Sequence, residues 1–150
     1  MCHVRITEAA AADIPQLCEL LGLLFAQEAD FTPNAEQQTG GLEMIVGHPD
    51  VGRLYCAREG NSVVGMVSIL FTVSTAQGGR AALLEDMVVH PARRGEGIGR
   101  RLLDEAIGRA REAGCKRITL LTDVTNESAM RFYGRAGFVP SRMVPLRISL

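Results

Sequence analysis

The stretch Val89-His-Pro-Ala-Arg-Arg-Gly-Glu-Gly-Ile-Gly99 places three glycines within five positions, directly before a segment with helical periodicity. Glycine lets a backbone adopt conformations that other residues avoid and lets it approach a ligand closely. The first turn of a helix leaves its N–H groups unpaired and carries the positive end of the helix dipole. We therefore interpret residues 94–100 as a phosphate- or pyrophosphate-binding loop, with added positive charge from Arg93, Arg94, Arg100 and Arg101.

Two common phosphate-binding motifs do not fit this loop. A Walker P-loop is excluded, because no Gly-Lys-Ser or Gly-Lys-Thr follows the glycines. A Rossmann dinucleotide site is disfavoured, because its glycines open the first unit of a parallel sheet. The remaining alternative is a glycine-rich turn with solvated arginines.

The chain before the loop predicts a short strand, two helices and three successive strands. The strands cover residues 4–7, 54–58, 62–74 and 80–89, and the short connections between the last three predict an antiparallel meander. In the first helix, Asp13 and Gln16 have the spacing of a capping box. Its apolar face consists of Ile14, Leu17, Cys18, Leu21, Leu24 and Phe25. A second helix is predicted over residues 34–46.

After the loop, a helix beginning near Ile98 should end at Gly114. A strand at 117–122, a helix at 127–136 and a last extended segment from Phe138 follow. The order β-α-α-β-β-β-α-β-α-β indicates an α/β fold, with a mixed sheet and helices on both faces. The length of 150 residues predicts a single domain over residues 1–150.

Composition narrows the class of protein. A formal net charge of -1 and an aromatic content of 5% disfavour a nucleic-acid partner. No stretch approaches the roughly 20 apolar residues of a membrane span, so we expect no membrane partner and a cytoplasmic location. The cysteines at positions 2, 18, 56 and 115 are dispersed, so we expect no metal site and no disulfide framework.

Two motifs in order resemble those of the GNAT N-acetyltransferase superfamily. Arg94, Gly97 and Gly99 fill the fixed places of its motif A, Q/R-x-x-G-x-G/A. The later stretch Asn126-Glu-Ser-Ala-Met-Arg-Phe-Tyr-Gly-Arg-Ala-Gly-Phe138 is similar to its motif B. The resemblance implies the GNAT acyl-CoA N-acyltransferase fold, and acetyl-CoA as the acyl donor.

The resemblance also implies a set of cofactor-binding residues. Loop amides would bind the CoA pyrophosphate, at Arg94, Gly95, Glu96, Gly97, Ile98, Gly99 and Arg100. Backbone groups of the preceding strand would bind the pantetheine arm and polarise the thioester carbonyl, at Met87, Val88 and Val89. Asn126 and Ala129 would contact the cofactor, although Asn126 is also a favoured helix N-cap.

Tyr133 and Glu85 are the implied catalytic residues. Tyr133 would protonate the departing CoA thiolate, and its alternative role is core packing. Glu85 and Asp86 interrupt an apolar strand, where regular alternation predicts that their side chains point to opposite faces. We prefer Glu85 as the general base or the amine ligand, against Asp86 or a structural ion pair. Acids after the first helix, Glu28 above all and Asp30, could attract a cationic amine.

The leading hypothesis is acetyl transfer to a primary amine of a small molecule, by direct attack within a ternary complex. The alternatives are a protein lysine or N-terminal acetyltransferase and a CoA-binding module without turnover. The acyl group, acetyl or longer, and the acceptor amine are not encoded in these motifs. The resemblance implies a final hairpin, but the tail is short and is interrupted by Pro140 and Pro145. The hairpin is therefore either short or completed by a neighbouring subunit, and a homodimer is a further possibility that we keep open.

Overall fold

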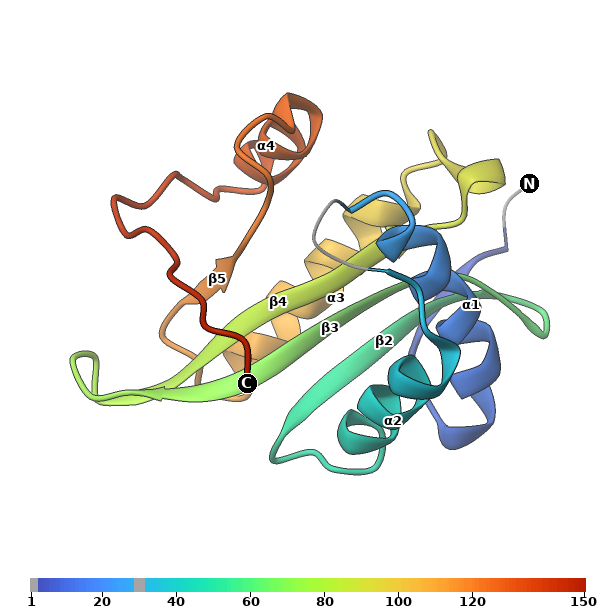
Figure 1. Ribbon diagram of the computed structural model, residues 1–150, viewed down its shortest axis with the longest axis horizontal. Helices are drawn as coiled ribbons and strands as arrows, with labels where there is room; N and C mark the ends of the chain where they lie inside the picture. The colour runs from blue at the N-terminus through green and yellow to red at the C-terminus, as the bar shows by residue number, and fades with distance from the viewer. Residues whose placement is uncertain (1–2, 29–31) are drawn as a thin grey trace. The chain divides into compact units, whose positions relative to one another are not determined.

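The computed structural model describes residues 3–28 and 32–150 (Figure 1). The chain divides into two compact units, Met1–Leu120 and Leu121–Leu150. The single domain expected from the length therefore stays a prediction. No helix in the described ranges is long and apolar enough to cross a membrane.

The first unit contains a five-stranded sheet in the order β1-β2-β3-β4-β5. Strands β1 to β4 are antiparallel neighbours, and β5 pairs parallel to β4. This confirms the predicted meander and mixed sheet, while β5 is shorter than expected. The strands are β1 (Arg5–Glu8), β2 (Gly52–Glu59), β3 (Ser62–Ser74), β4 (Gly79–Val89) and β5 (Ile118–Leu120).

Helices cover both faces of this sheet, as predicted. Helices α1 (Ile14–Phe25) and α2 (Ala35–Ile45) lie on one face, and α3 (Ile98–Glu112) lies on the other (Figure 1). Helix α2 forms despite two adjacent glycines, because Asn34 caps it by accepting a hydrogen bond from the N–H of Gln37 at 3.0 Å.

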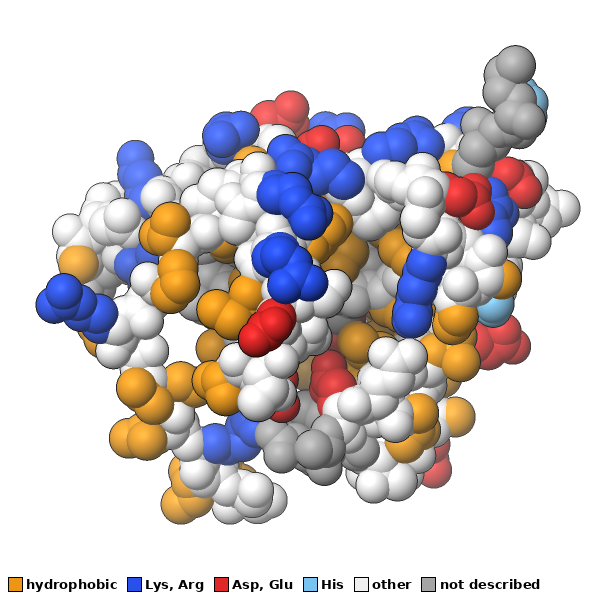
Figure 2. All heavy atoms as spheres, turned by 90° about the horizontal axis from the view of Figure 1, so that it is seen from above, with side chains coloured by type: hydrophobic (Ala, Val, Ile, Leu, Met, Phe, Trp, Pro, Cys, Tyr) orange, Lys and Arg blue, Asp and Glu red, His pale blue; other side chains and the backbone are white. Residues whose placement is uncertain are grey.

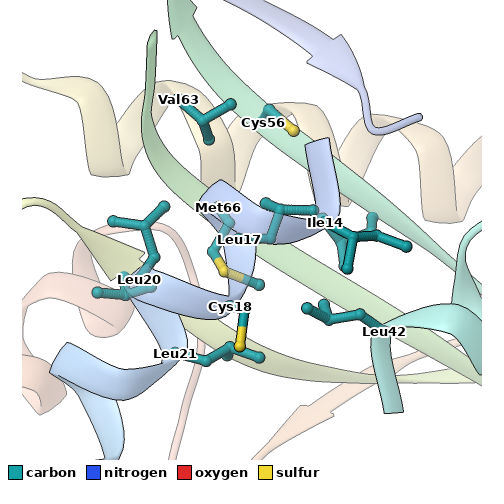
Figure 3. Close-up of a cluster of buried hydrophobic side chains, with 11 residues drawn as sticks. Ile14, Leu17, Cys18, Leu20, Leu21, Leu42, Cys56, Val63 and Met66 are labelled. Atoms are coloured by element: carbon teal, nitrogen blue, oxygen red, sulfur yellow. The ribbon is translucent and has the colours of Figure 1, made fainter. Parts of the chain in front are cut away.

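The apolar face of α1 forms a core with α2 and the sheet. Leu17 and Met66 are fully buried in this cluster, which also takes in Leu42 of α2 and Val88 of β4 (Figure 3). The predicted helical face is therefore confirmed, with Leu20 as an additional buried member. Packing of this face holds α1 against Met66 of β3 and Val88 of β4, and Val88 lies one residue before the end of β4, after which the glycine loop follows.

Asp13 occupies the N-cap position of α1, as predicted, but the predicted capping box with Gln16 is wrong. A short 3-10 helix, η1 (Ala11–Asp13), precedes α1, and the Asp13 side chain does not cap α1. Asp13 instead accepts two hydrogen bonds from the guanidinium of Arg58, at 2.8 and 2.9 Å. Gln16 reaches across to β3, where its amide oxygen accepts from the N–H of Val63 at 2.8 Å. Both side chains bond residues distant in sequence, which local spacing does not reveal.

The second unit contains α4 (Glu127–Arg135), capped by Asn126. The final strand predicted from Phe138 is absent from the described residues, where 138–150 form no helix or strand. Pro140 and Pro145 have no N–H to donate to a strand ladder, which is the physical reason the pairing fails there.

Candidate functional site

Strand β4 is bulged next to the predicted carboxylate pair. Met66 of β3 pairs with Val88 of β4, whereas Ser68, two residues further on, pairs with Glu85, three residues back. One extra residue of β4 is thus inserted, and Asp86 has a φ of 53°, in the left-handed region that non-glycine residues rarely adopt. Such a bulge bends a strand and redirects its side chains.

The prediction that Glu85 and Asp86 point to opposite faces stays a prediction, because the bulge begins directly after Glu85. Ser68 and Glu85 are directly opposite in register and therefore share a face of the sheet. The expectation assumed uninterrupted strand alternation, which the bulge breaks.

The carboxyl group of Asp86 has a strongly shifted acidity. Its burial, followed by the negative charges of Glu85 and Glu28, raises the pKa of Asp86 to about 6, against the opposing hydroxyl of Ser68. Glu85 and Glu28 are exposed, whereas Asp86 is half-buried. The end of α1 and the bulge of β4 therefore bring three carboxylates into electrostatic range, while Asp30 lies outside the described residues.

The pairing of β4 with its parallel neighbour, β5, ends just before the bulge. In the part of the chain that the structure describes, β5 pairs with β4 only over Ala82–Leu84. The backbone from Glu85 to Val89 thus has no β5 partner on that side. Val88 buries its side chain in the α1 core, so it can offer a ligand only its backbone groups. Met87 and Val89 are half-buried on either side of it.

The glycine loop joins β4 to α3. His90 follows the strand and is the N-cap of the short 3-10 helix η2 (Pro91–Arg93), where its Nδ1 accepts a hydrogen bond from the N–H of Ala92. Gly95 and Gly97 have φ angles of 83° and 79°, a conformation that would be strained in a residue with a side chain. A Cβ atom added at either glycine would meet no atom within 4 Å, so the space over the loop is open.

The start of α3 is suited to an anion. Its N-cap is Gly97, which has no side chain to cap the helix. The N–H groups of Ile98, Gly99 and Arg100 belong to the first turn, where no intrahelical acceptor exists. With the helix dipole and open glycines, these donors fit a pyrophosphate such as that of CoA.

The four arginines around the loop differ in their partners. Arg93 contacts the carboxylates of Glu59 and Glu96, and Arg100 pairs with Asp104 at 2.9 Å. Within the described ranges, Arg94 and Arg101 are exposed and form no ion pair. Figure 2 shows one face on which basic side chains are interspersed with acidic ones, as the balanced composition suggests.

The second unit holds the motif B residues. Asn126 accepts a hydrogen bond from the N–H of Ala129 at 3.0 Å, which confirms its N-cap role. Tyr133 packs edge-to-face with Phe132 and Phe138, at ring distances of 5.1 and 5.7 Å. Burial raises the pKa of the Tyr133 phenol. The cofactor contacts expected of Asn126, Ala129 and Tyr133 stay predictions.

None of the cysteines in the described residues is placed as a reactive nucleophile. Burial raises the pKa of Cys56 to about 12, and it also raises the pKa of Cys115. Cys18 is buried between α1 and α2, where the Gln38 amide donates to its sulfur at 3.4 Å. Cys2 lies outside the described residues. Among those described, no group of three or more histidines, cysteines and acids could hold a metal ion.

A cavity of about 490 Å³ lies between α1 and α2, and sequence reasoning missed it. It is formed entirely within the first unit and includes no residue of β4 or of the glycine loop. Its lining consists of Ile14, Pro15, Cys18, Glu19, Gly22, Pro33, Ala35, Gln38 and Thr39. The cavity is therefore separate from the bulged strand and the anion loop.

Comparison with known proteins agrees with this geometry. Residues 15–138 match the acetyltransferase (GNAT) family. Glucosamine 6-phosphate N-acetyltransferase of Trypanosoma brucei brucei is 32% identical over 59% of this chain, which spans 58% of that protein. Aminoalkylphosphonate N-acetyltransferase of Salmonella typhimurium is 29% identical over 94% of this chain and 87% of its own length.

A solved structure from Bacillus halodurans C-125, of a protein named as a transcriptional regulator, has 31% identity. It superimposes with a TM-score of 0.81 over 99% of this chain and 100% of its own.

Proposed function

The chain belongs to the acetyltransferase (GNAT) family and is an acyltransferase, and from this premise we propose that it acetylates a primary amine of a small molecule. The donor in this proposal is acetyl-CoA, and the amine attacks it directly within a ternary complex. The observation that carries the proposal is the bulged strand β4, open on its β5 side, which leads into the uncapped glycine loop.

The donor would supply an activated thioester, and the chain would hold it along β4. We assign the pyrophosphate to the N–H groups of residues 95–100, with Arg94 as a charged neighbour. The backbone groups of Met87, Val88 and Val89 on the side away from β3 would hold the pantetheine arm and polarise its carbonyl. Asn126 and Ala129 are assigned to the same arm.

The acceptor would meet the carboxylates at the bulge. An amine is protonated at pH 7 and must lose a proton before it attacks. The raised pKa of Asp86, about 6, makes it a better base than an ordinary carboxylate. We therefore assign proton removal to Asp86, and ammonium binding to Glu85 and Glu28. This reverses our preference from sequence, in which Glu85 was the base.

We assign to Tyr133 the protonation of the departing CoA thiolate. A phenol can donate a proton to a thiolate at modest cost, because their ordinary pKa values, about 10 and about 8.5, are close. A phenol is already protonated at neutral pH at its ordinary pKa. Burial raises the pKa of Tyr133 further, so the phenol stays protonated, but the gap in pKa that the proton transfer must cross becomes larger.

A small amine is favoured over a protein substrate because the two acetyltransferases compared above are named for small acceptors. A panel of small amines and of peptides, with release of free CoA thiol as the readout, tests the proposal. Turnover with peptides alone would favour a protein substrate. CoA binding without turnover on any amine would favour a binding module. A homodimer and a cytoplasmic location stay predictions.

Direct transfer has its own test. Because the pKa of Cys56 and that of Cys115 are raised, neither thiol is poised to carry an acetyl group. Mass spectrometry of the protein incubated with acetyl-CoA alone should show no acetylated cysteine. A stoichiometric acetyl-cysteine that is removed by adding amine would replace direct attack with a covalent route.

A further inference from the structure

Arg93 binds a carboxylate inside the glycine loop. Its Nε and Nη2 atoms donate to the two oxygens of Glu96, at 2.9 and 3.1 Å. Glu96 stands between Gly95 and Gly97, in the loop to which the pyrophosphate is assigned. A carboxylate at this position would repel a phosphate, so its neutralisation bears directly on the donor site.

The same guanidinium also hydrogen-bonds the hairpin that joins β2 to β3. Nη1 and Nη2 of Arg93 donate to the two oxygens of Glu59, at 3.3 and 3.2 Å. Glu59 is the last residue of β2 and pairs with Ser62 across the turn. The side chain of Arg93 is only 21% exposed, whereas those of Glu59 and Glu96 are 42% and 35% exposed. Arg93 therefore connects the loop to a fixed point of the sheet.

The Arg93–Glu96 ion pair affects the loop in two ways. It directs the Glu96 carboxylate toward the hairpin, while the peptide N–H of Glu96 remains part of the loop. The bidentate contacts also restrict a segment whose two glycines would otherwise have large conformational freedom. A loop ordered before binding loses less entropy when it closes on a ligand.

We propose that Arg93 is a positioning residue for the donor, which orders the glycine loop and holds the Glu96 carboxylate away from the pyrophosphate. This inference rests on the proposed function, in which the loop binds that pyrophosphate. Arg93 acts through Glu96 and Glu59, and it need not touch the donor.

Calorimetric titration with CoA at low ionic strength tests the proposal. Arg93→Met should raise the Kd by about tenfold, because a charge-assisted network is lost beside a bound anion. Arg93→Met combined with Glu96→Gln should return to within about threefold of wild type, since the repelling carboxylate is gone. An unchanged Kd in Arg93→Met, or a double variant as weak as the single one, would overturn the inference.

Arg109→Met is the control, because Arg109 also pairs with two carboxylates on α3, Glu105 and Glu112, but near the far end of the helix. Its Kd should equal that of wild type. Glu96→Gln alone removes the charge without removing Arg93. It should bind CoA at least as tightly as wild type, and a loss of more than about threefold would contradict the role assigned to Arg93.

A titration with 3′-dephospho-CoA shows which phosphate of the ligand the Arg93→Met substitution affects, since this ligand keeps the pyrophosphate and lacks the ribose phosphate. The same Kd ratio for both ligands is expected, and a ratio confined to CoA would overturn the assignment to the pyrophosphate. Wild-type protein that binds neither ligand would overturn the proposed function together with this inference. If wild-type protein binds CoA and the Arg93→Met variant binds it with the same Kd, only the inference about Arg93 is overturned.

Discussion

The hydroxyl of Ser68 donates a hydrogen bond of 3.1 Å to the carbonyl oxygen of Glu85, at the last regular pair before the bulge in β4. Ser68 is fully buried, so this hydrogen bond holds the β4 backbone at Glu85 from the interior of the protein. The next residue, Asp86, takes the left-handed conformation and becomes half-buried. The bulge thus sets both the acidity of one carboxylate and the path of the strand toward the glycine loop.

Asp86→Asn should abolish the acidic limb of the pH–rate profile. A base acts when deprotonated, so wild-type kcat should rise through about pH 6 and level off above pH 7, following the pKa of Asp86. We expect the variant to lose about 100-fold in kcat at pH 7.5. Glu85→Gln is the comparison variant, and its inflection should move to lower pH, because a charge that raises the pKa of Asp86 is removed. An Asp86→Asn enzyme with the wild-type inflection would rule out this base.

Asp86→Asn should also stabilise the protein at high pH. The folded-state pKa of Asp86 is raised from 3.8 to about 6, so its stabilising contribution is present below about pH 4 and lost as the pH rises through 6. At pH 8 the ionised carboxyl is unfavourable, and we expect the variant to gain about 1 kcal/mol in free energy of unfolding. Urea denaturation at pH 8 and pH 4 measures this difference, which should shrink at the lower pH. A destabilised variant at pH 8 would show that the carboxylate is structural.

Gly97→Ala should weaken CoA binding, because φ at this position is 79°. The left-handed conformation costs a residue with a Cβ about 1–2 kcal/mol, so the loop should shift and the Kd for CoA should rise by about tenfold. Gly108→Ala, in the interior of α3 with open space at its Cβ, should instead stabilise the protein by about 0.5–1 kcal/mol with unchanged CoA affinity. Equal CoA affinity in the two variants would contradict the anion-binding role of the loop.

Asp13→Asn should destabilise the fold at neutral pH and not in acid. The hydrogen bonds from Arg58 hold the pKa of Asp13 below its usual 3.8, and the Asp13 side chain is only 8% exposed. A depressed pKa gives stability that is present above the unfolded-state pKa of about 3.9 and is lost as the pH falls through the folded-state value. We expect a loss of about 2 kcal/mol at pH 7, measured by urea denaturation. Glu8→Gln, which breaks an exposed pair with Arg53, should cost less than about 1 kcal/mol. A difference between Asp13→Asn and wild type that persists undiminished at pH 2 would contradict the electrostatic origin.

Local patterns predicted the elements well, because strands and helices leave a period in the sequence. Ser62–Ser74 and Ile98–Glu112 begin where strand and helix periodicity place them. The bulge at Asp86 was not predictable in this way, since it depends on the register between two strands. Arg93 and Glu59 are 34 residues apart, and Asp13 and Arg58 are 45 apart, so no local spacing signals either pair. The loop was recognised from its glycines, whereas the partner that restrains it was visible only in three dimensions.

Tyr133→Phe should separate proton donation from packing. The change keeps the ring and its edge-to-face contacts with Phe132 and Phe138, and it removes only the hydroxyl. If the phenol protonates the departing thiolate, kcat should fall by about 10- to 100-fold while the Kd for CoA stays within about twofold. Tyr55→Phe is the control, because Tyr55 is 3% exposed in β2 and burial raises its pKa to about 12. That variant should keep the wild-type kcat. A Tyr133→Phe enzyme with wild-type kcat would assign the thiolate proton to another donor, and one with weakened CoA binding and unchanged kcat would make Tyr133 a packing residue.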